Sequence, residues 1–149
     1  MIKITKENLN LEEEFIKIHS KKNGAYSFFL GTVRQEIDDD INGIYLECYE
    51  DLAYSQLKQI KEDSIKKWNL SDCTIIHRIG DLNISDKIVL VITAAQHRSD
   101  CIKACEYIID TLKANVAFWK FHIKGKEKEP VDQKKKDLDK YLSRGQVIS

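Results

Sequence analysis

Basic side chains stand where the sequence pattern places the ends of strands and the start of a helix. Arg34 follows the β-forming run 25–33 (AYSFFLGTV), and its planar guanidinium suits a phosphate or a carboxylate. His97 and Arg98 separate a strand pattern from a helix pattern, where free amides and the helix dipole favour an anion. Taken singly, each segment is equally compatible with an anion site and with a solvated loop or a plain strand end.

Two lysines further along the chain could act as a base or a nucleophile. Lys113 ends a predicted helix, and Lys120 lies in the alternating segment 117–124, where it shares a face with Phe118 and His122. An amine surrounded by aromatic side chains can lose hydration, and desolvation favours its neutral, reactive form. The plainer interpretation is that a lysine near a helix C-terminus complements the helix dipole.

Other reactive side chains have structural interpretations. His77 and Arg78 form a second His–Arg pair, but it lies inside a predicted strand and is interpreted as structural. Cys101 and Cys105 share one face of a predicted helix and are expected in the core, with a redox or metal role as the less favoured alternative. The cysteines, expected as reduced thiols, are Cys48, Cys73, Cys101 and Cys105. Because they form no CxxC pair and have no histidine at ligand spacing, neither a metal site nor a cofactor is predicted.

Hydrophobic periodicity predicts the elements that must position these residues. Helices are expected at 10–20, 52–68 and 99–113, and strands at 25–33, 44–49, 73–80, 87–95 and 117–124. Ser99 or Asp100 would cap the last helix, and its apolar spacing places Ile102 on the core face. The connection 82–86 is short enough for an antiparallel strand pair.

The order of these elements predicts the fold class. Hairpin-like strands beside helices, without strict βαβ alternation, favour an α+β fold. The 149-residue chain is long enough to bury a core, and residues 1–124 are expected to form a single domain. The segment 125–149 is dense in charge and is predicted to be a C-terminal tail that is disordered or ordered by a partner.

The charge balance argues against several classes of protein. The chain has 24 Lys and Arg against 24 Asp and Glu, whereas bulk nucleic-acid binding requires a positive excess. No apolar run approaches the ~20 residues of a membrane span, and the acidic N-terminal segment is unlike a signal peptide. We therefore expect a cytoplasmic protein that binds neither nucleic acid nor membranes. RNA binding in particular is disfavoured because basic and aromatic side chains do not interleave on one strand face.

Four segments, in their order and spacing, resemble one known family. They are GAYSFFLGTVR, YLECYE, HRIGDLNISDKIVLVITAAQHR and ACEYIIDTLKANVAFWK, and together they span about residues 24–120. This pattern resembles the large, catalytic subunit of molybdopterin synthase. The resemblance implies a hammerhead-like α+β fold, with helices packed on a mixed or antiparallel sheet, and a homodimer within a heterotetramer.

The same resemblance implies an activity and a partner. The activity is that of a sulfurtransferase, which moves two sulfurs from the thiocarboxylated C-terminus of a small ubiquitin-like carrier to cyclic pyranopterin monophosphate. The product is the molybdopterin dithiolene. Both the pterin phosphate and the carrier C-terminus are anionic, which agrees with the basic residues identified above.

Residue roles also follow from the resemblance. Lys113 and Lys120 match the catalytic lysines: Lys113 is expected to assist sulfur attack by acid/base chemistry or transient covalent capture, and Lys120 to polarise the thiocarboxylate carbonyl. Arg34, His97 and Arg98 are expected to hold the phosphate and the pterin edges. The expected substrate-binding set is Thr32, Val33, Arg34, His97, Arg98, Lys113, Lys120, Phe121 and His122.

Three positions depart from the family pattern. The family usually has proline where this chain has Ala117, a basic residue is common where it has Phe121, and glutamate is frequent where it has His122. Because an imidazole cannot repeat the role of a carboxylate, either the pocket edge differs in this chain or that position tolerates change.

Helix geometry adds an expectation that the resemblance does not supply. Arg98 and Lys113 stand fifteen residues apart on one predicted helix, hence roughly 22 Å apart at ~1.5 Å per residue. Two long side chains can barely bridge that gap around a small ligand. We therefore predict composite sites in the homodimer, in which His97 and Arg98 of one subunit face the lysines and Arg34 of the other.

A rival interpretation is a binding module without catalysis. Such a dimer would dock a ubiquitin-like protein or an anionic metabolite and would not need both lysines. The two interpretations differ in whether product forms once the carrier and the pterin are bound.

Overall fold

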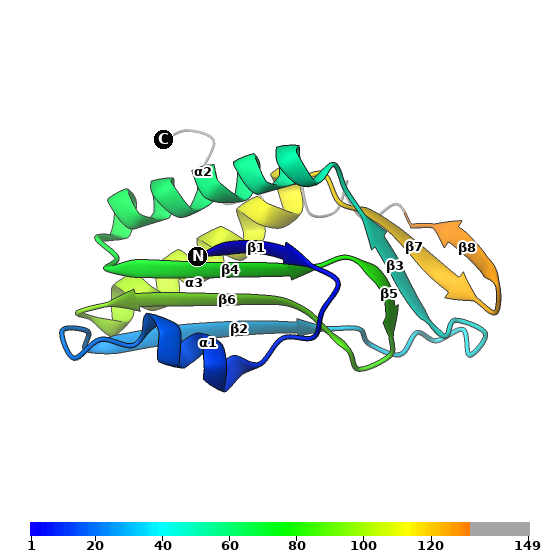
Figure 1. Ribbon diagram of the computed structural model, residues 1–149, viewed down its shortest axis with the longest axis horizontal. Coiled ribbons are helices and arrows are strands. Elements are labelled where there is room, and N and C mark those ends of the chain that lie inside the picture. Colours follow the sequence, from blue (N-terminus) through cyan, green and yellow to red (C-terminus); the bar gives the residue numbers. More distant parts are fainter. Residues whose placement is uncertain (132–149) are drawn as a thin grey trace.

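The computed structural model describes residues 1–131, in which two four-stranded sheets lie side by side along the molecule (Figure 1). The first sheet contains β1 (Ile2–Thr5), β4 (Asp72–Arg78), β6 (Lys87–Ala95) and β2 (Ala25–Thr32), in that order. The second contains β5 (Gly80–Asn83), β3 (Gly43–Glu47), β7 (Trp119–Lys124) and β8 (Glu127–Pro130). The helices are α1 (Leu11–Ile18), α2 (Glu50–Trp68) and α3 (Arg98–Asn115). The predicted α+β class is confirmed.

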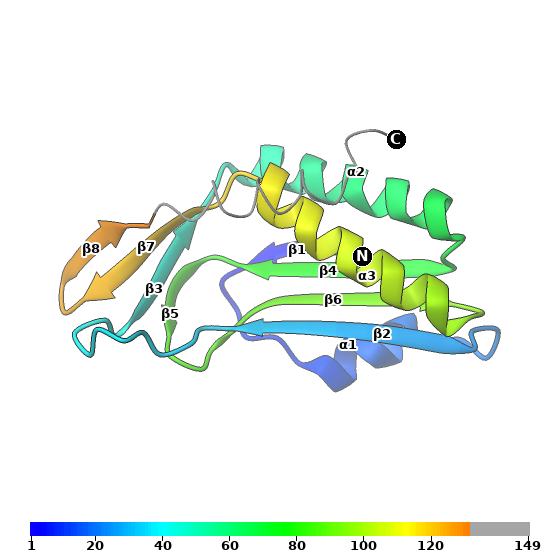
Figure 2. The same ribbon diagram turned by 180° about the vertical axis from the view of Figure 1, so that it is seen from behind.

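The first sheet is mixed and is buried on both faces. β1 runs parallel to β4, whereas β6 is antiparallel to both β4 and β2. Successive residues of a strand point to opposite faces, so Ile75 and Val91 pack under α2 and α3 while Ile76 and Leu90 pack under α1. The two views show these helices on opposite sides of the sheet (Figures 1 and 2). Burial on both sides explains why the β6 sequence is an almost continuous apolar run.

Helix α3 packs on the sheet through a stripe of small and aliphatic side chains. Cys101 and Cys105 are buried in this stripe, as predicted. The prediction for Ile102 is wrong, because its side chain is 56% exposed on the outer side of the stripe. The cap prediction is also wrong: the helix begins at Arg98, so Ser99 and Asp100 already belong to its first turn, and the N-cap residue makes no side-chain cap hydrogen bond.

Three short strands were not predicted, and two of them complete the second sheet. β5 pairs with β3, and Gly80, at φ +91°, allows the chain to leave β4 and turn directly into it. β8 pairs with β7, so the first residues of the predicted tail form a hairpin. β1 adds an edge to the first sheet. Four-residue strands carry little periodicity, which is why the hydrophobic pattern missed them. The rest of the predicted tail, 132–149, lies outside the described residues.

Along residues 1–131, each helix is too short or too polar to cross a membrane.

Candidate active site

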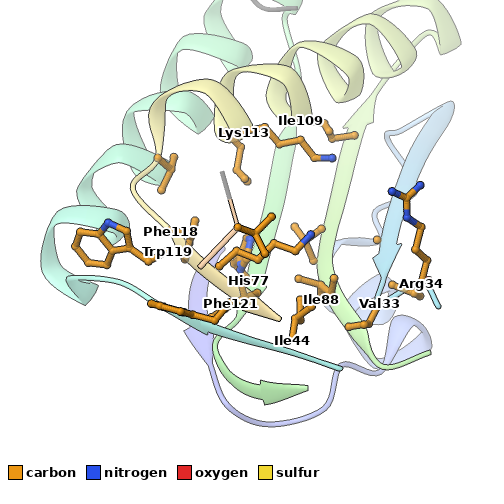
Figure 3. Close-up of a pocket in the computed structure, with 18 of the residues that line it drawn as sticks. Val33, Arg34, Ile44, His77, Ile88, Ile109, Lys113, Phe118, Trp119 and Phe121 are labelled. Atoms are coloured by element: carbon orange, nitrogen blue, oxygen red, sulfur yellow. The ribbon is translucent and has the colours of Figure 1, made fainter. Parts of the chain in front are cut away.

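A cavity of about 680 Å³ opens where the C-terminal end of α3 meets the second sheet (Figure 3). This volume suits a small metabolite together with a segment of extended chain. Much of its wall is apolar and aromatic, and the polar side chains enter from several separate elements. Of the predicted site residues, the cavity is lined by Thr32, Val33, Arg34, Lys113, Lys120 and Phe121.

The end of β2 fixes the position of Arg34. The strand pairing with β6 is irregular between Gly31 and Thr32, where the chain leaves the sheet. The buried Val33 is then held by two backbone bonds: its N–H donates to the Asp86 carbonyl at 2.9 Å, and its carbonyl accepts from the Ser85 N–H at 2.7 Å. Because this backbone is anchored, the guanidinium that follows stands at the cavity wall (Figure 3). Within residues 1–131 no carboxylate forms an ion pair with Arg34, so its donors are available to an anionic ligand.

Lys113 and Lys120 reach the cavity from different elements. Lys113 lies in the last turn of α3 and is exposed, whereas Lys120 is partly buried on β7. In the β3–β7 ladder Lys120 lies opposite Leu46 and shares its face of the sheet, and the buried Leu46 itself lines the cavity. This face of β7 is therefore turned inward. No side chain of residues 1–131 forms an ion pair with Lys113.

His97 and Arg98 do not line this cavity. Both are exposed at the N-terminal end of α3, and Figure 2 shows the helix running from the far end of the first sheet to the second sheet. The helix is 18 residues long, so its first turn lies far from the cavity at its last turn. Of the five predicted basic residues, a single chain therefore brings Arg34, Lys113 and Lys120 to the cavity. The composite arrangement across two subunits stays a prediction.

His122 also lies apart from the lining residues, but it contacts one of them. Its Nε2 atom lies 3.6 Å from the Oε1 atom of Glu36, and Glu36 lines the cavity. A carboxylate of the loop after Arg34 therefore lies at this edge of the cavity, beside the position on β7 where this chain has His122. Glu36 was not predicted as a site residue, because nothing in the spacing of the chain shows that this loop folds back onto β7.

His77 is a second cavity residue outside the predicted site, because its place inside a strand predicted only a structural role. It is buried, its ring stacks on Phe118 with centroids 3.8 Å apart, and its Nδ1 atom lies 2.8 Å from the Arg78 carbonyl oxygen. Burial lowers the pKa of His77 to about 4, and the positive charge of Lys113 acts in the same direction, although the contact with Arg78 opposes the shift. The imidazole is therefore neutral at pH 7. Nδ1 donates to the carbonyl, and Nε2 is left as an acceptor.

Arg78, by contrast, has the structural role that was predicted. Its guanidinium donates to the backbone carbonyls of Lys87 at 3.1 Å and Lys6 at 3.2 Å, which joins the end of β4 to the first residue of β6 and to the segment that follows β1.

The neutral His77 predicts how stability depends on pH. Its pKa is about 4 in the folded protein and 6.5 in the unfolded chain, so the unfolded chain takes up the proton first as pH falls. Its contribution is complete above pH 6.5 and declines toward pH 4, by about 3 kcal/mol in total. In His77→Asn an amide can still donate to the Arg78 carbonyl but does not titrate. Urea unfolding at pH 7, 5.5 and 4.5 should give a smaller loss of stability in the variant than in the wild type. Equal losses would contradict the assignment of a neutral, buried imidazole.

The cysteines are not part of the cavity lining within residues 1–131. All four are free thiols, and burial raises the pKa of Cys73 to about 12, which makes it unreactive. In the same part of the chain, no three His, Cys, Asp or Glu side chains gather closely enough to hold a metal ion.

Comparison with known proteins identifies the family. The model of the MoaE protein family matches residues 4–115. The molybdopterin synthase catalytic subunit of Pyrococcus abyssi is 31% identical over 115 residues, which cover 76% of this chain and 78% of that protein. The corresponding subunit of Vibrio cholerae is 31% identical over 138 residues, covering 91% and 92%.

Solved structures agree with this assignment. The molybdopterin biosynthesis MoaE protein from Burkholderia ambifaria has a TM-score of 0.82 at 33% identity and covers 97% of this chain and 96% of its own. The molybdopterin synthase from Staphylococcus aureus has a TM-score of 0.81 at 30% identity, covering 87% and 96%. The resemblance seen in the four sequence segments is thus confirmed, and the chain belongs to the MoaE protein family.

Proposed function

We propose that the chain is the catalytic subunit of a molybdopterin synthase. In this reaction two sulfurs pass from the thiocarboxylated C-terminus of a small ubiquitin-like carrier to cyclic pyranopterin monophosphate. The observation that supports this most is the convergence of Arg34, Lys113 and Lys120, from three elements, on one cavity with a largely apolar wall. Fixed cationic donors in such a surrounding stabilise a phosphate, a thiocarboxylate and the charge that develops during transfer.

In the proposed reaction the thiocarboxylate sulfur attacks a side-chain carbon of the pterin, forms a C–S bond and displaces the oxygen that this carbon carried, so that a C–O bond breaks as the C–S bond forms. The bond between this sulfur and the carrier's acyl carbon then breaks, and water completes the carrier's carboxylate. Lys120 polarises the acyl carbonyl, and Lys113 moves the proton that accompanies attack or captures the acyl group transiently. A second carrier repeats the transfer at the neighbouring carbon, which yields the dithiolene.

We further infer that the working unit is a homodimer that binds one carrier per subunit. The length of α3 supports this inference, because it keeps His97 and Arg98 too far from Lys113 to act on one small ligand within a single chain. In a composite site these two residues come from the second subunit and hold the phosphate and pterin edges beside Arg34.

We place the reaction in the cytoplasm, where the reducing environment suits four free cysteines.

A single-turnover assay tests the proposed function. The purified protein is mixed with thiocarboxylated carrier and the pterin phosphate, and both carrier binding and pterin products are followed. The proposal predicts a sulfur-containing pterin together with carrier that has lost its sulfur. Tight carrier binding without any product would instead favour the rival interpretation, a non-catalytic binding module for the carrier or an anionic metabolite.

A further inference from the structure

Glu36 differs in charge from the other polar residues of the cavity. Among the lining residues within 1–131 it is the only carboxylate, and it follows Arg34 by two positions. Its side chain is 23% exposed, and its one ion-pair contact in this part of the chain is the 3.6 Å approach of His122, which is longer than a hydrogen bond. The carboxylate therefore keeps most of its capacity to accept hydrogen bonds from a ligand.

The chemistry of this carboxylate limits what can lie against it. A phosphate or a thiocarboxylate in direct contact with this carboxylate is repelled, so neither anionic group of the proposed reaction is its partner. The best partner of the Glu36 carboxylate is a pair of parallel N–H donors in one plane, because each of its two oxygens can accept one of the two hydrogen bonds. The pyrimidine edge of a pterin presents such a pair of donors, its 2-amino group and its N3–H.

Resting on the proposed function, we propose that Glu36 binds the 2-amino and N3–H groups of the pterin ring and selects pterins over related rings that lack the amino group. The position of Glu36 agrees with this orientation. Glu36 lies beside His122, and His122 follows Lys120 by two residues on β7. At strand spacing these two β7 positions are about 7 Å apart. A fused bicyclic ring can bridge this distance. The pyrimidine edge then lies at the loop, and the side chain that receives sulfur lies near the lysines.

Equilibrium binding of two ring systems tests this role without relying on catalysis. The probes are neopterin monophosphate and its lumazine counterpart, which has an oxygen in place of the 2-amino group. Wild-type protein should bind the pterin at least about tenfold more tightly, because the lumazine oxygen faces the carboxylate. Glu36→Gln should weaken pterin binding by about 10–100-fold and bring the two affinities within about threefold of each other. Asp39→Asn removes the same charge from the exposed part of the loop and should keep the wild-type preference.

The ratio of the two affinities distinguishes this proposal from a structural role of Glu36. If Glu36 only holds the loop against His122, Glu36→Gln weakens both probes equally and the preference for the pterin survives, which would overturn the proposal. Wild-type protein that binds both probes equally would overturn it as well. Glu36→Asp, which retains the carboxylate on a shorter side chain, should keep part of the preference. Failure of the proposed function would appear separately, as absence of sulfur transfer by wild-type protein in the single-turnover assay.

Discussion

Lys113→Ala is expected to slow sulfur transfer by about 10²–10⁴-fold in single turnover, the range found when a positioned proton-transfer group is lost. The reason is the position of this amine. It ends α3, it enters the cavity that also holds Lys120 and Arg34, and no carboxylate of residues 1–131 pairs with it. Because the side chain is exposed, its removal leaves no hole in the core, and the folded dimer should still bind the carrier. The rate and the carrier affinity are measured on the same preparation.

Two matched variants separate chemistry from charge. Lys103→Ala removes an exposed lysine from the same helix, away from the cavity, and should transfer sulfur at the wild-type rate. Lys113→Arg keeps the positive charge but cannot exchange a proton or form a covalent bond, so it should remain slow. Recovery of the wild-type rate in Lys113→Arg would show that only charge is needed at this position. An unchanged rate in Lys113→Ala would remove the lysine from the mechanism.

Mixed dimers are expected to recover activity that neither variant has alone. If each site takes Arg98 from one subunit and Lys113 from the other, a heterodimer of Arg98→Ala and Lys113→Ala contains one site with both substitutions and one intact site. Such a heterodimer should show about half of the wild-type activity per dimer, as two-fold symmetry requires. The expected effect is large because both homodimers should be nearly inactive. Differently tagged subunits, purified through both tags, give the heterodimer for the assay.

The homodimers of each variant, purified through the same tags, are the controls. Activity in the verified heterodimer no higher than in these controls would contradict the composite site. In that case Arg98 and Lys113 would have to act within one chain, although α3 holds them at its opposite ends.

The elements that hold the site were predictable where their hydrophobic pattern is long. β6 was predicted at its observed bounds, and α2 and α3 were placed to within two residues, because each buries a continuous apolar run or stripe. β5 and β8 were not predicted. Each has four largely polar residues and becomes a strand by pairing: β5 pairs with β3, which is distant in sequence, and β8 pairs with β7 in a hairpin.

The site residues likewise fall into those that could be predicted from the sequence and those that could not. Arg34, Lys113 and Lys120 lie in or just after regular elements, so the sequence pattern and the resemblance both pointed to them. Glu36 and His77 line the cavity because of contacts between segments that are distant in sequence. The loop that carries Glu36 folds back onto β7, and the ring of His77 stacks on Phe118. Neither contact produces a periodic pattern of residues in the sequence.

Isotopic labelling measures whether sulfur moves from the carrier to the pterin on this chain. The carrier is prepared with a ³⁴S-labelled thiocarboxylate, reacted with wild-type protein and the pterin phosphate, and the pterin products are weighed by mass spectrometry. If the chain transfers both sulfurs, the product contains two heavy sulfurs and is accompanied by carrier that has lost its label. Unlabelled product, or carrier that stays bound with its labelled thiocarboxylate intact, would contradict this transfer.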